Sequence, residues 1–209
     1  MVPSSAAKID DAMHGTSGPL TTSIREPVNP IAEAFVAACN EVGYPTVDYN
    51  AGAEEGASLF QLTIRDGQRC STAKAFLQPA RSRTNLSIQT YCTVTKLLIN
   101  VDGPQKFAQG VECVLGKGLG NETGRTRFRA RKEVVLSAGA VGSPHILLLS
   151  GIGDREALAQ VGVECILHLP EVGGNLQDHL MLPMGTWVRR LFQSDRGRVQ
   201  LLKTSFLMA

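Results

Sequence analysis

The sequence is short of the features that mark membrane, metal-binding and nucleic-acid-binding proteins. No apolar run approaches the ~20 residues that a transmembrane helix needs. The five cysteines are odd in number and widely spaced, with no CxxC pair. Neither a zinc site nor a dense disulfide framework is therefore indicated, and free thiols are expected. The net charge of +2 is close to balance and gives no reason to expect a nucleic-acid partner.

What is present is the composition of a globular protein. Hydrophobic residues make up 43% of the 209 residues and charged residues 19%, which argues against disorder. The clearest helix signal has Asn29 as its cap and Pro30 in its first turn, and it ends at Gly43. We expect this helix to bury one apolar stripe, made of Ile31, Ala34, Phe35, Ala38, Cys39 and Val42.

The segments after this helix predict short strands and one further helix. Residues 59–64 predict a strand followed by a turn at Asp66-Gly67, and residues 71–77 a short helix that ends before Pro79. Further extended segments are expected at 86–90, 94–99, 109–115, 125–131 and 133–136, the last of them buried.

Four arginines fall on one face of a predicted strand, because side chains alternate with a period of two. They are Arg125, Arg127, Arg129 and Arg131. A phosphate or nucleic-acid stripe is one interpretation. No aromatic residues alternate with the arginines as a base-stacking platform would need, so we favour the solvated face of an antiparallel hairpin.

The most informative stretch is GAVGSPHILLLSGIG, residues 139–153, which follows the apolar run at 134–136. A strand that leads through small residues into a helix is typical of nucleotide-binding α/β folds, because small residues let the backbone approach a ligand closely. Ser143-Pro144 suits the start of a short helix. Ligands gather outside the carboxyl ends of parallel strands, which makes Ala138 and Gly139 candidate binding residues.

Four segments, in order, resemble the motifs of the glucose-methanol-choline (GMC) family of flavin oxidoreductases. Residues 139–153 resemble its second signature. The other three are HGTSGPL at 14–20 (family HGxxGPL), RCSTAKAFL at 69–77 (RxSTAxxYL) and LPEVGGNLQDH at 169–179 (LPGVGxNLQDH, with Glu171 in place of Gly). The sequence of residues 69–77 most resembles the arthropod glucose dehydrogenase and the choline dehydrogenase branches of the family.

The resemblance implies an α/β fold in several parts. Residues 14–68 would be part of an antiparallel substrate-binding domain. Residues 69–180 would be part of a Rossmann-like FAD-binding domain with a β-meander, and residues 181–209 would begin a further substrate-domain segment.

The resemblance also implies a chemistry, the oxidation of a small-molecule alcohol to a carbonyl with FAD as hydride acceptor and a histidine as proton acceptor. It places Val94 where the backbone pairs with the adenine ring of FAD. A strand backbone offers the amide and carbonyl that such pairing needs, although an ordinary apolar strand residue is the alternative from β-propensity.

Two family features are missing. No GxGxxG loop for the FAD pyrophosphate is present, and the nearest glycines, 116, 118 and 120, fall in a loop between strands. We assign no catalytic residue. His14 belongs to a turn, His145 to a structural helix and His168 to a strand, while His179 closes the NLQDH segment.

We therefore expect a fragment of a flavin enzyme that binds FAD poorly and does not turn over alone. One alternative is a non-catalytic product, a truncated or degenerate paralogue. Another is a hydrolase that uses Ser143 or Ser150 with Asp178 and His179. Neither serine lies in a GxSxG elbow, which argues against the hydrolase.

Overall fold

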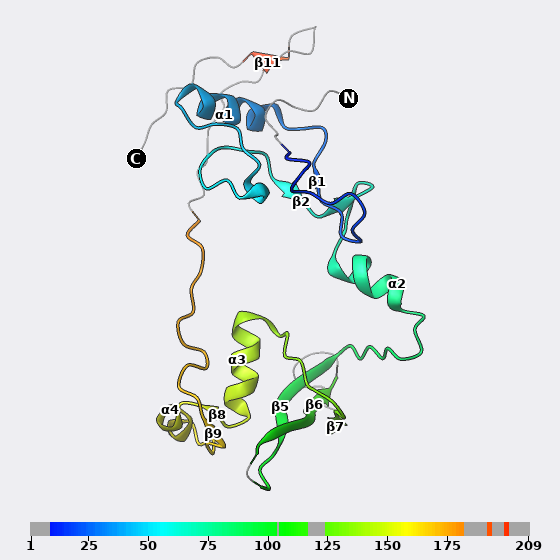
Figure 1. The fold of residues 1–209 in the computed structure, drawn as a ribbon, viewed down its shortest axis with the longest axis vertical. Coiled ribbons are helices and arrows are strands. Elements are labelled where there is room, and N and C mark those ends of the chain that lie inside the picture. The colour runs from blue at the N-terminus through cyan, green and yellow to red at the C-terminus, as the bar shows by residue number, and fades with distance from the viewer. Residues whose placement is uncertain (1–8, 104, 117–123, 182–191, 194–198, 201–209) are drawn as a thin grey trace. The chain divides into compact units, whose positions relative to one another are not determined.

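The computed structural model describes residues 9–103, 105–116, 124–181, 192–193 and 199–200 (Figure 1). The chain divides into two compact units, the first made of residues 1–87 with 185–209 and the second of residues 88–184. No helix among the described residues is both long enough and apolar enough to cross a bilayer.

The first unit combines one long helix with very short strands. Its elements are β1 (Ser23–Ile24), α1 (Pro30–Glu41), a 3-10 turn (Tyr49–Ala51), β2 (Gln61–Leu62), β3 (Ile64–Arg65), β4 (Gln68–Arg69), a π-helical turn (Ala73–Leu77), α2 (Gln78–Ala80), β10 (Phe192–Gln193) and β11 (Val199–Gln200). The strands pair antiparallel as β1–β2, β3–β4 and β10–β11. The β3–β4 hairpin turns at Asp66-Gly67 as expected.

Helix α1 begins where its cap signal predicts, but it buries a different stripe. The Asn29 Oδ1 accepts a hydrogen bond from the Ile31 amide at 3.0 Å. The expected stripe is wrong at Phe35 and Val42, which are 50% and 72% exposed, whereas Cys39 does pack against the core. Val36 is buried instead, with Ala57 and Leu59, and four partly buried residues pack against these three: Ile24, Val28, Ala32 and Cys39.

Two other sequence expectations for this unit are corrected. The helix at 71–77 does not end before Pro79. The π-helical turn runs directly into α2, and Pro79 lies inside this continuous helical stretch. Residues 86–90 form no strand and are exposed.

The second unit is built on a β-meander, as the sequence predicts. Strands β5 (Cys92–Asn100), β6 (Phe107–Leu115) and β7 (Arg125–Arg129) form an antiparallel sheet in the order β5-β6-β7. The β5–β6 register shifts between Val94 and Lys96 and again between Leu98 and Ile99. In the described residues β6 is the only strand that pairs with β5, so β5 lies at an edge of this sheet.

The remaining elements of the second unit follow the meander. They are α3 (Gly139–Leu149), β8 (Ile152–Gly153), α4 (Arg155–Gln160) and β9 (Leu167–His168), with β8 and β9 paired in parallel. Helix α3 lies beside β5 (Figure 1). Asp154 caps α4 by accepting a hydrogen bond from the Ala157 amide at 2.9 Å.

Two expectations around the glycine-rich stretch are wrong. The helix begins at Gly139 and not at Pro144, which lies inside α3. Residues 133–136 are not a buried strand, and Val135 is 73% exposed. A strand needs a neighbour for its backbone hydrogen bonds, and the structure pairs no described strand with this segment. The mixed α/β class is confirmed, while the Rossmann-like detail stays a prediction.

The core of the first unit allows a matched test. Val36→Ala should lower the free energy of unfolding by about 1–3 kcal/mol, because it removes two methyl groups from a packed site. Val42→Ala, the same change at an exposed position of the same helix region, should stay within about 0.5 kcal/mol of the parent. Urea unfolding followed by circular dichroism measures both, and equal losses would contradict the observed stripe.

Candidate functional site

Val94 lies on the edge strand of the meander. It is half-buried and pairs with Cys113 of β6. Backbone groups of β5 that point away from β6 have no sheet partner among the described strands. One of them, the Leu97 amide, donates to the Ser150 hydroxyl at 2.8 Å. An edge backbone of this kind can offer N–H and C=O groups to a ligand.

Ala138 and Gly139 form the start of α3, and both are exposed. The Ala138 amide donates to Ser143 Oγ at 3.0 Å, so Ser143 serves the helix start from inside the helix. Gly139 has a φ of 87°, in the left-handed region that favours glycine. A Cβ added there would meet no atom within 4 Å, so the glycine leaves open space in front of the helix end.

Ser150 fixes α3 against β5. It is the C-cap of α3 and is buried, and its hydroxyl donates to the Ile146 carbonyl while it accepts from the Leu97 amide. The sequence predicts that Ser150-Gly151 ends the helix and offers Ser150 as a possible nucleophile, but it gives no sign of the bond to β5. A serine in a Ser-Gly dipeptide at a helix end gives no local sign that its hydroxyl bonds to a distant strand.

The structure gives no support to the hydrolase alternative. In the part of the chain that it describes, no hydrogen bond joins Ser143 or Ser150 to His179. The Asp178 carboxylate accepts a hydrogen bond from the His179 backbone amide, and His179 is exposed. The Ser150 hydroxyl is hydrogen-bonded to two backbone groups, the Leu97 amide and the Ile146 carbonyl.

A groove of about 630 Å³ runs along α3. One wall is formed by Ala140, Val141 and His145 of the helix, and the other by residues 173–177. His145 is the one titratable side chain among the residues that line it. The groove therefore joins the second signature to the NLQDH segment, which the sequence separates by about twenty residues.

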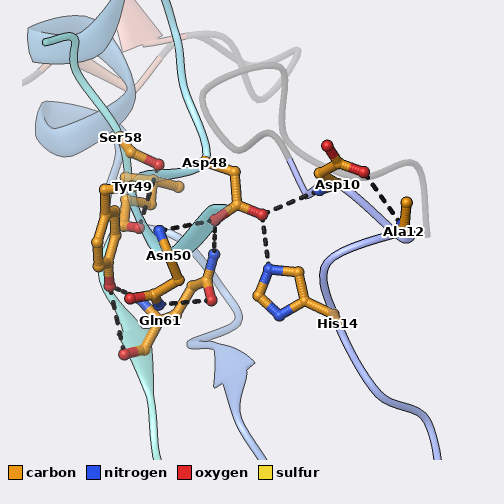
Figure 2. Close-up of polar contacts among 9 residues, drawn as sticks. Asp10, Ala12, His14, Asp48, Tyr49, Asn50, Ser58 and Gln61 are labelled. Atoms are coloured by element: carbon orange, nitrogen blue, oxygen red, sulfur yellow. Dashed lines mark hydrogen bonds and ion pairs between the residues drawn. The ribbon is translucent and has the colours of Figure 1, made fainter. Parts of the chain in front are cut away.

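The first unit contains a polar cluster centred on Asp48 (Figure 2). Asp48 is buried, and it accepts hydrogen bonds from the amides of Asp10 and Asn50 and from the Gln61 side chain, at 2.9, 3.1 and 2.7 Å. His14 Nε2 lies 2.7 Å from Asp48 Oδ2. An ionised carboxylate only accepts, so His14 carries its proton on Nε2. We refer to Asp10, His14, Asp48, Asn50 and Gln61 as the Asp48 cluster.

These contacts keep Asp48 ionised. The hydrogen bond from the Asp10 amide, ahead of those from His14 and Gln61, lowers the pKa of Asp48 to about 2 against the opposing effect of burial. The cluster holds the HGTSGPL segment onto the region that follows α1. Sequence analysis placed His14 in a turn but gave no sign of its partner.

The arginine face of the meander is organised by a second buried carboxylate. Glu112 on β6 accepts from Arg125 at 2.8 Å and from Arg127 at 3.3 Å. The Arg125 hydrogen bond is the largest of several effects that lower the pKa of Glu112. All four arginines are exposed, which agrees with a solvated hairpin face.

His168 also has plain structural surroundings. His168 Nδ1 accepts a hydrogen bond from the Arg155 amide at 3.2 Å and lies 4.0 Å from Asp154. Within the described ranges, no group of three histidine, cysteine or acidic side chains is placed to hold a metal ion. The arrangement as a whole offers backbone groups and a groove for binding.

Comparison with known proteins gives one consistent family. A family model described as GMC oxidoreductase matches residues 4–181. Human mitochondrial choline dehydrogenase is 42% identical over 168 residues, which are 79% of this chain and 26% of that protein. Glucose dehydrogenase (FAD, quinone) of Drosophila melanogaster is 44% identical over 152 residues, which are 72% of this chain and 23% of that protein.

A solved structure agrees with these relatives. A crystal structure of formate oxidase superposes with a TM-score of 0.61 and 27% identity, over 73% of this chain and 25% of that chain. The chain spans a third or less of the length of the curated relatives named in these comparisons.

The contact between Ser150 and β5 can be tested directly. Ser150→Ala removes the acceptor of the buried Leu97 amide, and it should lower the free energy of unfolding by about 1–3 kcal/mol. Ser137→Ala, at an exposed position just before α3, is the matched control and should change it by less than about 0.5 kcal/mol. Urea unfolding of the parent and the two variants measures these free energies. If Ser150→Ala leaves the free energy of unfolding unchanged, the contact is dispensable for stability.

The Asp48 cluster predicts a dependence of stability on acid. The pKa of Asp48 is about 2 in the folded chain and 3.8 in the reference state, so the stabilisation is complete above about pH 4 and is lost as the pH falls towards 2. The parent should therefore lose stability over this window more steeply than Asp48→Asn, which lacks the charge at every pH.

Thermal unfolding between pH 2 and 7 measures this difference. Asp11→Asn, which changes an exposed carboxylate near the same segment, should follow the parent curve. Parallel curves for the parent and Asp48→Asn would contradict the prediction.

Proposed function

This chain belongs to the GMC oxidoreductase family, and on that premise we propose that it forms the FAD-contacting part of an oxidoreductase that acts on small-molecule alcohols. The match over residues 4–181 and the similarity to choline and glucose dehydrogenases support this assignment. The formate oxidase of Aspergillus oryzae, to which this chain is similar, is a protein in which modification of FAD occurs. FAD is therefore the cofactor that the proposal requires.

The observation that carries the proposal is the open start of α3 in the second signature. Gly139 combines a left-handed backbone with free space where a Cβ would lie, and both it and Ala138 are exposed. This is a surface that a planar or phosphorylated ligand can approach closely. Val94 lies on the strand beside the same helix, and its backbone would contact the adenine ring.

When bound, FAD would supply the hydride acceptance that alcohol oxidation needs. The residues of this chain would bind and orient it. We assign none of the four histidines as a general base, and His145 lines the groove beside α3. His14 is hydrogen-bonded to the Asp48 carboxylate, His168 accepts from a backbone amide and His179 is exposed beside Asp178. The sequence also has no GxGxxG loop to hold a pyrophosphate. We propose that the 209-residue chain binds FAD weakly and does not turn over by itself.

The proposed substrate-binding and FAD-binding parts coincide only partly with the two compact units. Residues 14–68 would belong to a substrate-binding part, residues 69–180 to an FAD-binding part and residues 181–209 to a further substrate segment. The boundary between the compact units falls at residue 87 and leaves the STAKAFL helix with the first unit. The groove beside α3 and the strand that carries Val94 both lie in the second unit.

A pair of glycine substitutions tests the site. Gly139 and Gly162 both have positive φ, 87° and 72°, and an added Cβ meets no atom within 4 Å at either. Gly139→Ala and Gly162→Ala should therefore cost a similar amount of stability, on the order of 1 kcal/mol. Gly139→Ala alone should weaken FAD binding, by about tenfold, because it moves the backbone that contacts the cofactor.

FAD titration followed by quenching of flavin fluorescence measures the affinity, and reduction of a dye with alcohols measures turnover. If the two variants bind FAD with equal affinity, Gly139 is not part of the FAD-binding site. Tight binding with turnover by the parent chain would refute the proposal that the chain is inactive alone.

A further inference from the structure

Two cysteines of the meander lie on the same face of the sheet. Cys92 opens β5 and pairs with Leu115, whereas Cys113 on β6 pairs with Val94. No register shift separates Cys92 from Val94, so the two cysteines are diagonal neighbours across the β5–β6 pair. Cys113 is completely buried, Cys92 is half-buried and both are free thiols.

The two thiols also interact, and they differ in reactivity. Burial, followed by a side-chain hydrogen bond with Cys92, raises the pKa of Cys113 to about 11. Cys113 therefore stays protonated at neutral pH and is shielded from solvent. Cys92 is the member of the pair that an oxidant can reach, and Cys113 is the neighbour that can react next.

We propose that Cys92 and Cys113 form a reversible disulfide when the protein meets hydrogen peroxide or an organic hydroperoxide. The Cys92 sulfur attacks one peroxide oxygen, the O–O bond breaks, and a sulfenic acid and water (or an alcohol) are formed. The Cys113 sulfur then displaces the hydroxyl from the Cys92 sulfur, which forms the S–S bond and releases a second molecule of water. Two thiols are oxidised by two electrons and one peroxide is reduced.

The position in the sheet favours reversibility. Diagonal neighbours in antiparallel pairs have Cα atoms roughly 7–8 Å apart. Disulfides usually span about 4.4–6.8 Å, so this one requires β5 and β6 to draw together at one end. A bond that forms under such constraint is more easily reduced than a structural disulfide. It therefore behaves as a modification and not as part of the folded framework.

The disulfide would also act on the strand that carries Val94, which lies two residues after Cys92 and opposite Cys113. Drawing Cys92 towards β6 displaces the β5 backbone at that point. This consequence rests on the proposed function, because it assumes that the Val94 backbone contacts FAD. Oxidation should then weaken FAD binding by about tenfold.

Thiol counting and peptide mapping test the disulfide without reference to FAD. The reduced chain is treated with a few equivalents of hydrogen peroxide under non-denaturing conditions. Titratable thiols should fall from five to three per chain. Trypsin separates the two cysteines into peptides 84–96 and 107–117, which should appear as one cross-linked species that dithiothreitol divides. Absence of this species, or oxidation of Cys92 to the sulfinic acid without a cross-link, would overturn the proposal.

Single substitutions assign the roles. Cys92→Ser should abolish the cross-link and retain four thiols, whereas Cys165→Ser, at another half-buried cysteine, should leave the cross-link in place. Cys113→Ala should let the Cys92 sulfenic acid be trapped by dimedone, and urea unfolding checks that the variant is folded. A cross-link between other cysteines in the parent would also contradict the proposal.

The FAD consequence is measured separately, by flavin titration of the oxidised and reduced parent. If oxidation leaves the affinity for FAD unchanged, the proposed effect on Val94 is refuted. The disulfide itself is judged by the peptide mapping alone. Parallel titration of Cys92→Ser before and after peroxide shows whether any change comes from this pair.

Discussion

The hydrogen bond between the Leu97 amide and the Ser150 hydroxyl is the contact on which the geometry of the second unit depends. It satisfies an amide on the edge of β5 where none of the described strands pairs, and both residues are buried. The same hydroxyl is tied to the last turn of α3 through the Ile146 carbonyl. The helix is therefore fixed to the sheet at one end, and the positions of Gly139 and Val94 follow from that attachment.

Two buried carboxylates organise a histidine and two arginines in the described part of the chain. Asp48 accepts from two backbone amides, a glutamine and His14, and Glu112 accepts from Arg125 and Arg127. Each carboxylate stays charged because its donors compensate for lost water. His14, Arg125 and Arg127 thus serve as hydrogen-bond donors to these two carboxylates. What is left for a cofactor is mainly backbone, at the open start of α3 and along β5.

Several elements could be predicted because their signals are local. Asn29-Pro30 defines the start of α1, and the extended segments expected at 94–99, 109–115 and 125–131 correspond to the three strands of the meander. Prediction failed where residues distant in the sequence determine which side chains are buried or whether a segment forms a strand. Helix α1 is rich in apolar residues on more than one side, and the packing of residues 57–59 selects Val36 in place of Phe35. Residues 133–136 have the composition of a strand but no partner strand in the described part of the chain.

The sequence by itself determined the family, since four ordered motifs needed no coordinates, and it determined the approximate places of the main helices and the meander. The tertiary structure alone decided which face of α1 is buried, where α3 begins, and that Ser150 and Asp48 have structural partners. The reason is the range of the forces involved. Caps, turns and alternation act between residues a few positions apart, whereas burial and the pairing of buried polar groups depend on segments brought together from 34 to 53 positions apart, as for His14 with Asp48 and Leu97 with Ser150.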